Sequence, residues 1–143
     1  MKVISILGFV LMIATILLLL KDGVLFGNNS ISVAVQVLAV CLMIWARVVF
    51  GKRSFHAVGN PTDGPLVRTG PYQYIRHPIY AAVLYFVWAG VLTHFTMMTV
   101  TIGLFAILGA GMRIFVEETF LRQRYPEYAE YANRTKRILP FLV

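Results

Sequence analysis

Four long apolar segments, separated by shorter polar ones, dominate the pattern of this chain. Residues 3–20 carry no charged side chain, and residues 31–50 are almost as apolar. Two further apolar segments cover about residues 78–93 and 96–116. Because a helix rises 1.5 Å per residue, about 20 residues cross a hydrocarbon layer of about 30 Å. The pattern predicts an all-α, polytopic membrane protein with about four transmembrane helices.

The first apolar segment has a second interpretation, a secretory signal that would be removed. Its apolar run is longer than the usual core of such a signal, and no clear small-residue cleavage site follows. We therefore expect residues 3–20 to be a retained helix.

Composition supports a membrane protein. Of 143 residues, 59% are hydrophobic, whereas roughly 45–50% is usual for soluble domains. The net charge of +7 could indicate nucleic acid, but the basic residues flank apolar segments, which favours a lipid bilayer as partner. A single cysteine excludes an intrachain disulfide, and no metal-ligand spacing is present. We expect one domain over residues 1–143, with no metal and no nucleic-acid partner.

The distribution of charge predicts the topology. With four spans, both termini and the loop of residues 51–77 share one side of the membrane. Most basic residues fall on that side, whereas Lys21 falls on the other. By the positive-inside rule the basic side is cytoplasmic, so both termini should be cytoplasmic, at the inner membrane if the chain is bacterial. Those on the cytoplasmic side before the third span include Lys2, Lys52, Arg53, Arg68 and Arg76.

The polar run of residues 70–80 leads into the third apolar segment. Pro78 suits the first position of a helix, and His77 should be extended before it. The amides of Ile79, Tyr80 and Ala81 would then point out of a helix N-terminus, which suits an anion. The alternative is a simple membrane-entry turn with tyrosines at the interface.

A second polar cluster follows the fourth apolar segment. Arg113 and Glu117 are four residues apart and share a helix face. A charge in the middle of a membrane is costly, so we expect Arg113 to reach the interface. The alternative is a pair of weak interfacial ion pairs, Arg113 with Glu117 and Glu118 with Arg122.

The tail beyond the fourth segment predicts a cytoplasmic amphipathic helix. Pro126 suits its first position. Tyr125, Tyr128 and Tyr131 are spaced by three and form an aromatic stripe. We expect this helix to lie on the membrane surface, held by its tyrosines and by anionic lipid.

Several motifs occur in order along the second half of the chain. They are Leu-Val-Arg-Thr-Gly-Pro-Tyr at 66–72, Arg-His-Pro-Ile-Tyr at 76–80, Glu-Glu-Thr-Phe-Leu at 117–121, the tyrosine-rich run 125–131 and Arg-Ile-Leu-Pro at 137–140. Together they resemble the isoprenylcysteine carboxyl methyltransferase and phospholipid methyltransferase family of integral membrane enzymes. The resemblance covers about residues 50–141. Two departures are Ala82, where the family often has glycine, and a short N-terminal part, and both bear on substrate identity.

The resemblance implies S-adenosyl-L-methionine as methyl donor, with S-adenosyl-L-homocysteine as product. It places the cofactor in a region of about residues 64–80 and 113–140, and Arg113 on the substrate side. We add Glu118, the neighbour of Glu117, to the expected cofactor contacts. The expected contacts are Leu66, Val67, Tyr72, His77, Pro78, Ile79, Tyr80, Glu117 and Glu118.

The residues leave the methyl acceptor open, although a lipidic molecule is expected. A carboxylate acceptor needs no general base, and Arg113 could orient it. An amine acceptor must lose a proton, and His77 or Glu118 would then be the candidate base. Carboxyl O-methylation is favoured. The other possibilities are phospholipid or other amine N-methylation, a nicotinamide-dependent membrane reductase, or a non-enzymatic membrane protein.

Every methyltransferase interpretation requires the same spatial arrangement. The corner at His77 and Pro78 must meet the acidic end of the fourth helix in a single pocket.

Overall fold

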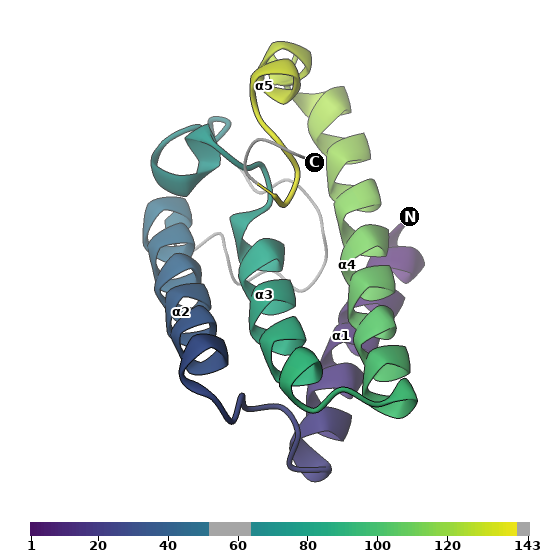
Figure 1. Cartoon of the computed structure of the whole chain (residues 1–143). Coiled ribbons are helices and arrows are strands. Elements are labelled where there is room, and N and C mark those ends of the chain that lie inside the picture. The colour runs from purple at the N-terminus through teal and green to yellow at the C-terminus, as the bar shows by residue number, and fades with distance from the viewer. Residues whose placement is uncertain (52–63, 140–143) are drawn as a thin grey trace.

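Helices form the regular structure of the described residues, 1–51 and 64–139, in this computed structural model (Figure 1). Within those residues there is no strand, and a single isolated parallel bridge joins Ile75 to Lys136. In chain order the helices are α1 (Lys2–Lys21), α2 (Ser30–Phe50), the 3-10 helix η2 (Gly70–Gln73), α3 (Pro78–Thr93), α4 (Met97–Arg124) and α5 (Tyr128–Arg134).

Local sequence signals set the helix starts. The side chain of Asn29 accepts a hydrogen bond from the amide of Ser32 at 2.9 Å, which closes a capping box at the start of α2. Thr96 and Thr99 form the corresponding box at the start of α4. Pro78 occupies the first position of α3, as predicted, because its missing amide costs nothing there.

The predicted spans agree with α1, α2 and α3, but α4 extends further than expected. It continues to Arg124 instead of ending near residue 116, so Arg113, Glu117 and Glu118 belong to one continuous helix. By length and composition α1, α2 and α4 can each cross a membrane, whereas α3 is apolar but has only 16 residues. The chain is an all-α, polytopic membrane protein.

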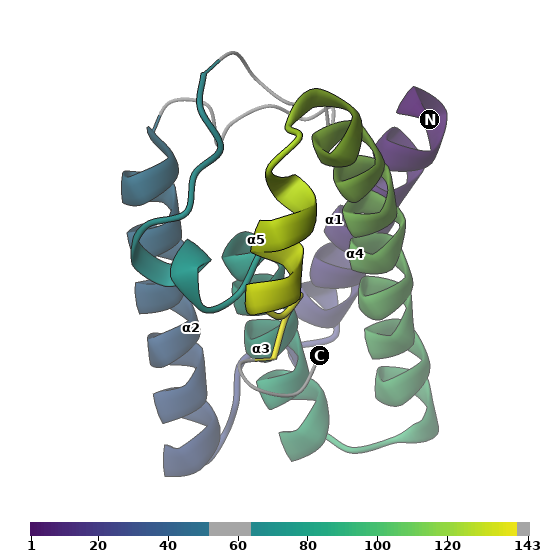
Figure 2. The ribbon, with the colours of Figure 1, turned by 90° about the horizontal axis from the view of Figure 1, so that it is seen from above.

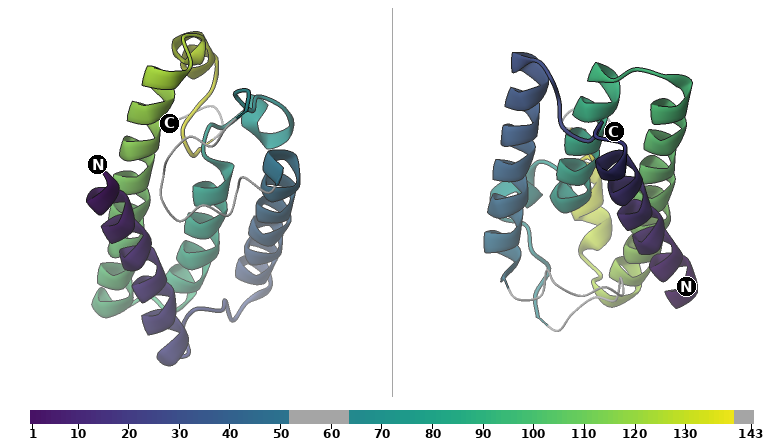
Figure 3. Two further views of the ribbon diagram at one scale, coloured as in Figure 1. Left: turned by 180° about the vertical axis from the view of Figure 1, so that it is seen from behind. Right: turned by 90° about the horizontal axis from the view of Figure 1, so that it is seen from below.

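The helices pack as two antiparallel pairs joined through α3 and α4. α1 lies along α4 and α2 lies along α3, as the views from behind and below show (Figure 3). The buried core between α3 and α4 includes Leu84, Val87, Ala106 and Ala110. Much of α1 and α2 is exposed and apolar, as expected for surfaces that face lipid.

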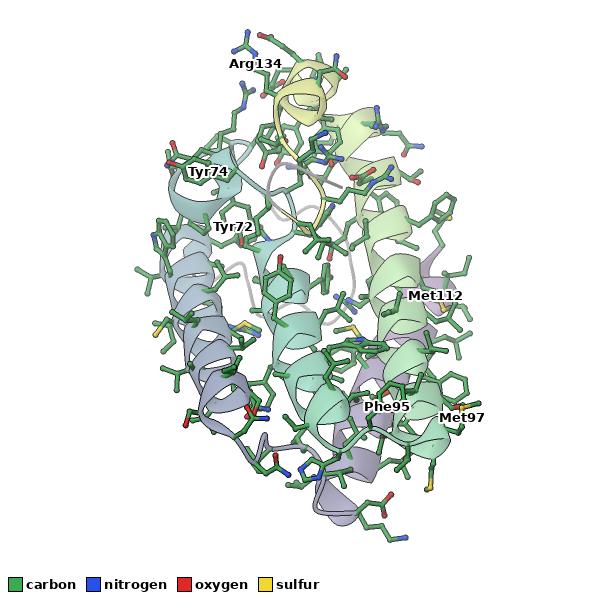
Figure 4. The ribbon with its side chains drawn as sticks, viewed as in Figure 1. Tyr72, Tyr74, Phe95, Met97, Met112 and Arg134 are labelled. Atoms are coloured by element: carbon green, nitrogen blue, oxygen red, sulfur yellow. The ribbon has the colours of Figure 1, made fainter. Side chains whose placement is uncertain are left out.

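The polar parts of the chain gather at one end of this bundle. η2, the start of α3, the end of α4 and α5 lie together there, while the α1–α2 and α3–α4 connections lie at the other end (Figure 1). Figure 4 shows Arg134 at the first end and Phe95 and Met97 at the second. Two basic residues used to predict the topology, Lys52 and Arg53, lie outside the described residues.

The expectation for the tail was wrong in its details. α5 begins at Tyr128 rather than at Pro126 and has seven residues. Tyr128 and Tyr131 are buried within the protein instead of contacting lipid. The Tyr131 hydroxyl donates to the Tyr72 carbonyl at 2.6 Å, which holds this side chain toward the bundle. Seen from above, α5 lies in the middle of this end of the bundle, between η2 and α4 (Figure 2).

Candidate functional site

The two regions that the sequence required to meet do meet. His77 directly precedes α3, with φ −124° and ψ 58° instead of the extended conformation that was expected. Its ring lies close to two carboxylates of α4. His77 Nδ1 is 3.6 Å from Glu117 Oε2, and His77 Nε2 is 3.4 Å from Glu118 Oε1. The His77–Pro78 corner and the acidic end of α4 therefore form one site.

A chain of polar contacts extends from Glu117 toward the membrane. The Tyr80 hydroxyl donates to Glu117 and accepts from Arg113 Nε at 2.8 Å. Arg113 also lies 3.8 Å from Glu117, one helical turn along α4. Tyr80 thus connects a carboxylate to a guanidinium, and the three side chains form a continuous polar wall.

Arg113 is buried among protein side chains, which the sequence did not indicate. Its side chain is only 5% exposed, and a guanidinium nitrogen donates to the Ser5 carbonyl of α1 at 3.4 Å. Its guanidinium lies 5.3 Å from the ring centre of Phe9 and 5.6 Å from that of Tyr80. These partners replace the water that a charged group would otherwise need.

Glu118 faces a different set of partners. Its carboxylate lies 3.1 Å from Arg76 Nε and 3.3 Å from a terminal nitrogen of Arg137. These contacts replace the predicted pair with Arg122, whose guanidinium lies over the ring of Tyr128. Glu118 therefore joins the loop before α3 to the C-terminal tail.

Arg76 completes this connection through the backbone of the tail. Its guanidinium donates to the carbonyl of Ala132 at 2.7 Å and to that of Thr135. Its own amide donates to Lys136 O at 2.7 Å. We call Arg76, Glu118, Thr135 and Arg137 the latch, because they hold the tail against the site.

The tyrosines around the site remain neutral. Burial, followed by the negative charge of Glu117, raises the pKa of Tyr72, and burial raises the pKa of Tyr131 to about 12. Tyr72 points into the bundle whereas Tyr74 lies on its outside (Figure 4). The Tyr128 hydroxyl is buried and has no hydrogen-bond partner within residues 1–51 and 64–139.

The surroundings of His77 favour its charged form. Burial alone would lower the pKa of His77, but the contacts with Glu117 and Glu118 outweigh burial and raise the pKa above its ordinary value. A protonated histidine ring that contacts two carboxylates pairs with both of them, and in that form it cannot act as a general base.

The helix N-terminus at Pro78 differs slightly from the prediction. The amide of Ala81 donates to the His77 carbonyl at 3.0 Å, so it is already used within the helix. This leaves the amides of Ile79 and Tyr80 as the first-turn donors. Leu66 and Val67 are half-buried in the segment before η2, and in the described part of the chain no hydrogen bond or ion pair joins them to the site.

The sequence did not assign several residues of the site. Arg76 and Arg137 lay within recognised motifs, which was a usable signal, but their common partner Glu118 is distant in sequence. Ser5 and Phe9 gave no signal, because they lie in an apolar segment. Over residues 1–51 and 64–139, no group of three or more His, Cys, Asp or Glu side chains could hold a metal ion.

Comparisons with known proteins cover much of the chain. The model of the isoprenylcysteine carboxyl methyltransferase (ICMT) family matches residues 31–123. The cobalt-zinc-cadmium resistance protein CzcN of Cupriavidus metallidurans is 37% identical over 86 residues, which are 59% of this chain and 40% of that protein. The chain thus spans less than half the length of this relative. No solved structure was found to match the chain.

Proposed function

The chain belongs to the isoprenylcysteine carboxyl methyltransferase family, and we propose that it transfers a methyl group from S-adenosylmethionine to the carboxylate of a lipidic acceptor held in the membrane. The observation that carries this proposal is the polar wall formed by Glu117, Tyr80 and Arg113. It joins a partly exposed carboxylate and a buried guanidinium to one phenol.

The residues of the polar wall and of the start of α3 fit the donor's functional groups. The Glu117 carboxylate would hold its ammonium group or ribose hydroxyls, and the amides of Ile79 and Tyr80 would hold its carboxylate. Neutral tyrosines would provide flat surfaces for adenine. The Tyr128 hydroxyl, which has no hydrogen-bond partner among the described residues, is a buried donor that a ligand could use. When bound, S-adenosylmethionine would supply a methyl group activated by a positively charged sulfur.

The protein's part in the reaction is alignment and exclusion of water. Arg113 would orient an acceptor carboxylate, with Tyr80 fixing the guanidinium through its hydroxyl. Methyl transfer to an ionised carboxylate requires no proton removal, so effective orientation in a water-poor site is the main requirement.

The charge state of His77 favours a carboxylate over an amine as acceptor. An amine must be deprotonated before it accepts a methyl group, and His77 was the candidate base. Its raised pKa and its two carboxylate partners favour the protonated ring, which has no lone pair to accept a proton. Glu118 is likewise engaged by Arg76 and Arg137.

An apolar cavity below the site supports a lipidic acceptor. It has a volume of about 190 Å³ and lies among α1, α2 and α3, with Ile16, Val40, Met43 and Phe86 in its lining. Ala82 and Val83, which also line it, are within a turn of Tyr80. A cavity of roughly 150 Å³ holds benzene in other proteins, so this one would hold part of an isoprenoid or acyl tail.

Transfer of radiolabelled methyl by the purified protein tests the proposal. The acceptors are N-acetyl-S-farnesylcysteine, quinone precursors and extracted lipids. We expect label on a carboxyl group, released by mild base as expected for an ester. We expect Arg113→Ala to lower turnover at least tenfold while leaving the affinity for S-adenosylhomocysteine within about twofold, since charge-assisted hydrogen bonds are worth about 1.5–3 kcal/mol.

Two results would reject the proposal. Label on nitrogen would point to amine methylation, and binding of NADPH without S-adenosylhomocysteine would point to a reductase. Equal loss of transfer and of S-adenosylhomocysteine affinity in Arg113→Ala would instead move Arg113 to the cofactor side.

A further inference from the structure

We propose that Phe9 of α1 contacts the acceptor and forms the wall past which the acceptor's carboxylate reaches Arg113. This inference rests on the proposed function and deepens it. It concerns a helix that lies outside the family match, which covers residues 31–123. It therefore assigns a role that the match does not supply.

The first argument is the position of the Phe9 ring. The Arg113 guanidinium lies 5.3 Å from the ring centre of Phe9 on α1 and 5.6 Å from that of Tyr80 on α3. Arg113 is buried, whereas Phe9 is 40% exposed. Phe9 is therefore a boundary residue, with the buried charge on one side and lipid on the other.

The second argument is that the backbone holds α1 against α4 at this level. A Cβ on Gly8 would lie 2.7 Å from the Gly109 carbonyl and 3.1 Å from Arg113 Cγ. Only a residue without a side chain fits so close an approach. The Ser5 carbonyl accepts from Arg113 one turn earlier on α1. Phe9 is thus held beside the guanidinium by the packing of two helices.

The third argument is the path that α1 offers to an apolar tail. Ile16, which lines the apolar cavity, lies seven residues after Phe9 and therefore about two turns further on nearly the same helix face. An acceptor with its carboxylate at Arg113 can extend along α1, past Phe9, toward that cavity. A molecule with a charged head and an isoprenoid tail fits this path, with its head at Arg113 and its tail running past Phe9 to the apolar cavity.

Photocrosslinking tests the contact without relying on methyl transfer. Phe9 is replaced by photoreactive benzoylphenylalanine, and Phe105, an exposed phenylalanine on α4, is replaced in the same way as matched control. Each protein is irradiated with N-acetyl-S-farnesylcysteine or with its methyl ester. We expect the carboxylate to crosslink at position 9 several times more than at position 105, and Arg113→Gln to remove most of that difference.

Equal yields at the two positions, or a yield at position 9 that is the same for the carboxylate and the ester, would overturn the inference. A carboxylate-dependent crosslink at position 9 from a protein that transfers no methyl group would support the contact and reject the proposed reaction. The two failures are therefore distinguishable.

Kinetics provide a second measurement. Phe9→Leu should raise the acceptor KM about fivefold, within the range of a lost aromatic contact, while kcat and S-adenosylhomocysteine affinity stay within about twofold. Phe105→Leu should change none of these values. Equal changes in the two variants, or a fall in kcat with KM unchanged, would contradict an acceptor contact at Phe9.

Discussion

Glu117 and Glu118 are neighbours of the same residue type, yet they belong to two different regions. The side chain of Glu117 is 26% exposed and joins Tyr80 and Arg113 in the polar wall. The side chain of Glu118 is 8% exposed and joins Arg76 and Arg137 in the latch. Consecutive positions on a helix point about 100° apart, so one acidic pair serves both the pocket and its support.

His77 connects these two regions, because its two ring nitrogens face one glutamate each. The comparison of Glu117 with Glu118 shows that the surrounding residues, rather than the residue type, decide whether a carboxylate is available to a ligand or serves the structure. Glu117 is partly exposed, whereas Glu118 is surrounded by cationic groups of the protein. Substitution of Glu118 should therefore lower the stability of the protein, whereas substitution of Glu117 should lower its affinity for the ligand.

The largest effect is expected for Glu118→Ala. Removing one partner of a buried ion pair leaves the other charge uncompensated, which costs about 3–5 kcal/mol. Arg76 would be left buried without its carboxylate, and the tail would lose the contact between Arg137 and Glu118. The free energy of unfolding in mixed detergent micelles measures this effect.

Glu130→Ala is the matched control, because Glu130 and Arg134 form a highly exposed pair. Such pairs contribute about 0–1 kcal/mol. If Glu118→Ala and Glu130→Ala destabilised the protein equally, the latch would have no structural role.

The next effect concerns ligand affinity. Glu117→Ala should weaken binding of S-adenosylhomocysteine at least tenfold, since a charge-assisted hydrogen bond is worth about 1.5–3 kcal/mol, and should leave the protein folded. Titration calorimetry in detergent measures the affinity. Unchanged affinity would remove Glu117 from the cofactor site, and unfolding would show that Glu117 acts like Glu118.

Much of this arrangement follows from local sequence signals. Long apolar segments located α1 and α2, Pro78 located the start of α3, and the spacing of Arg113 and Glu117 placed them on one face. The latch could not be predicted in this way. Arg76 and Thr135 are 59 residues apart, and no periodicity connects a loop to a tail.

Burial was the other property that the sequence did not reveal. Arg113 was expected at the interface, because a lone charge avoids the membrane interior. Its burial depends on Tyr80 from α3 and on Ser5 and Phe9 from α1, so it follows from tertiary packing. The tail tyrosines turn inward for the same kind of reason, since Tyr131 finds a carbonyl partner at Tyr72.

The smallest effect is expected from the pH dependence of His77, which links the two regions. Its pKa is raised in the folded protein, so its contribution to stability is fully present below the unfolded pKa of about 6.5. That contribution is lost as pH rises through the folded pKa, when the imidazolium loses its charge.

Wild-type stability should therefore fall above about pH 6.5, and His77→Gln should remove that fall. His94→Gln, a change at a half-buried histidine far from the two glutamates in sequence, is the control and should retain it. A decline of the same size in all three proteins would show that His77 carries no charge between the two glutamates, and the pocket and the latch would then be independent.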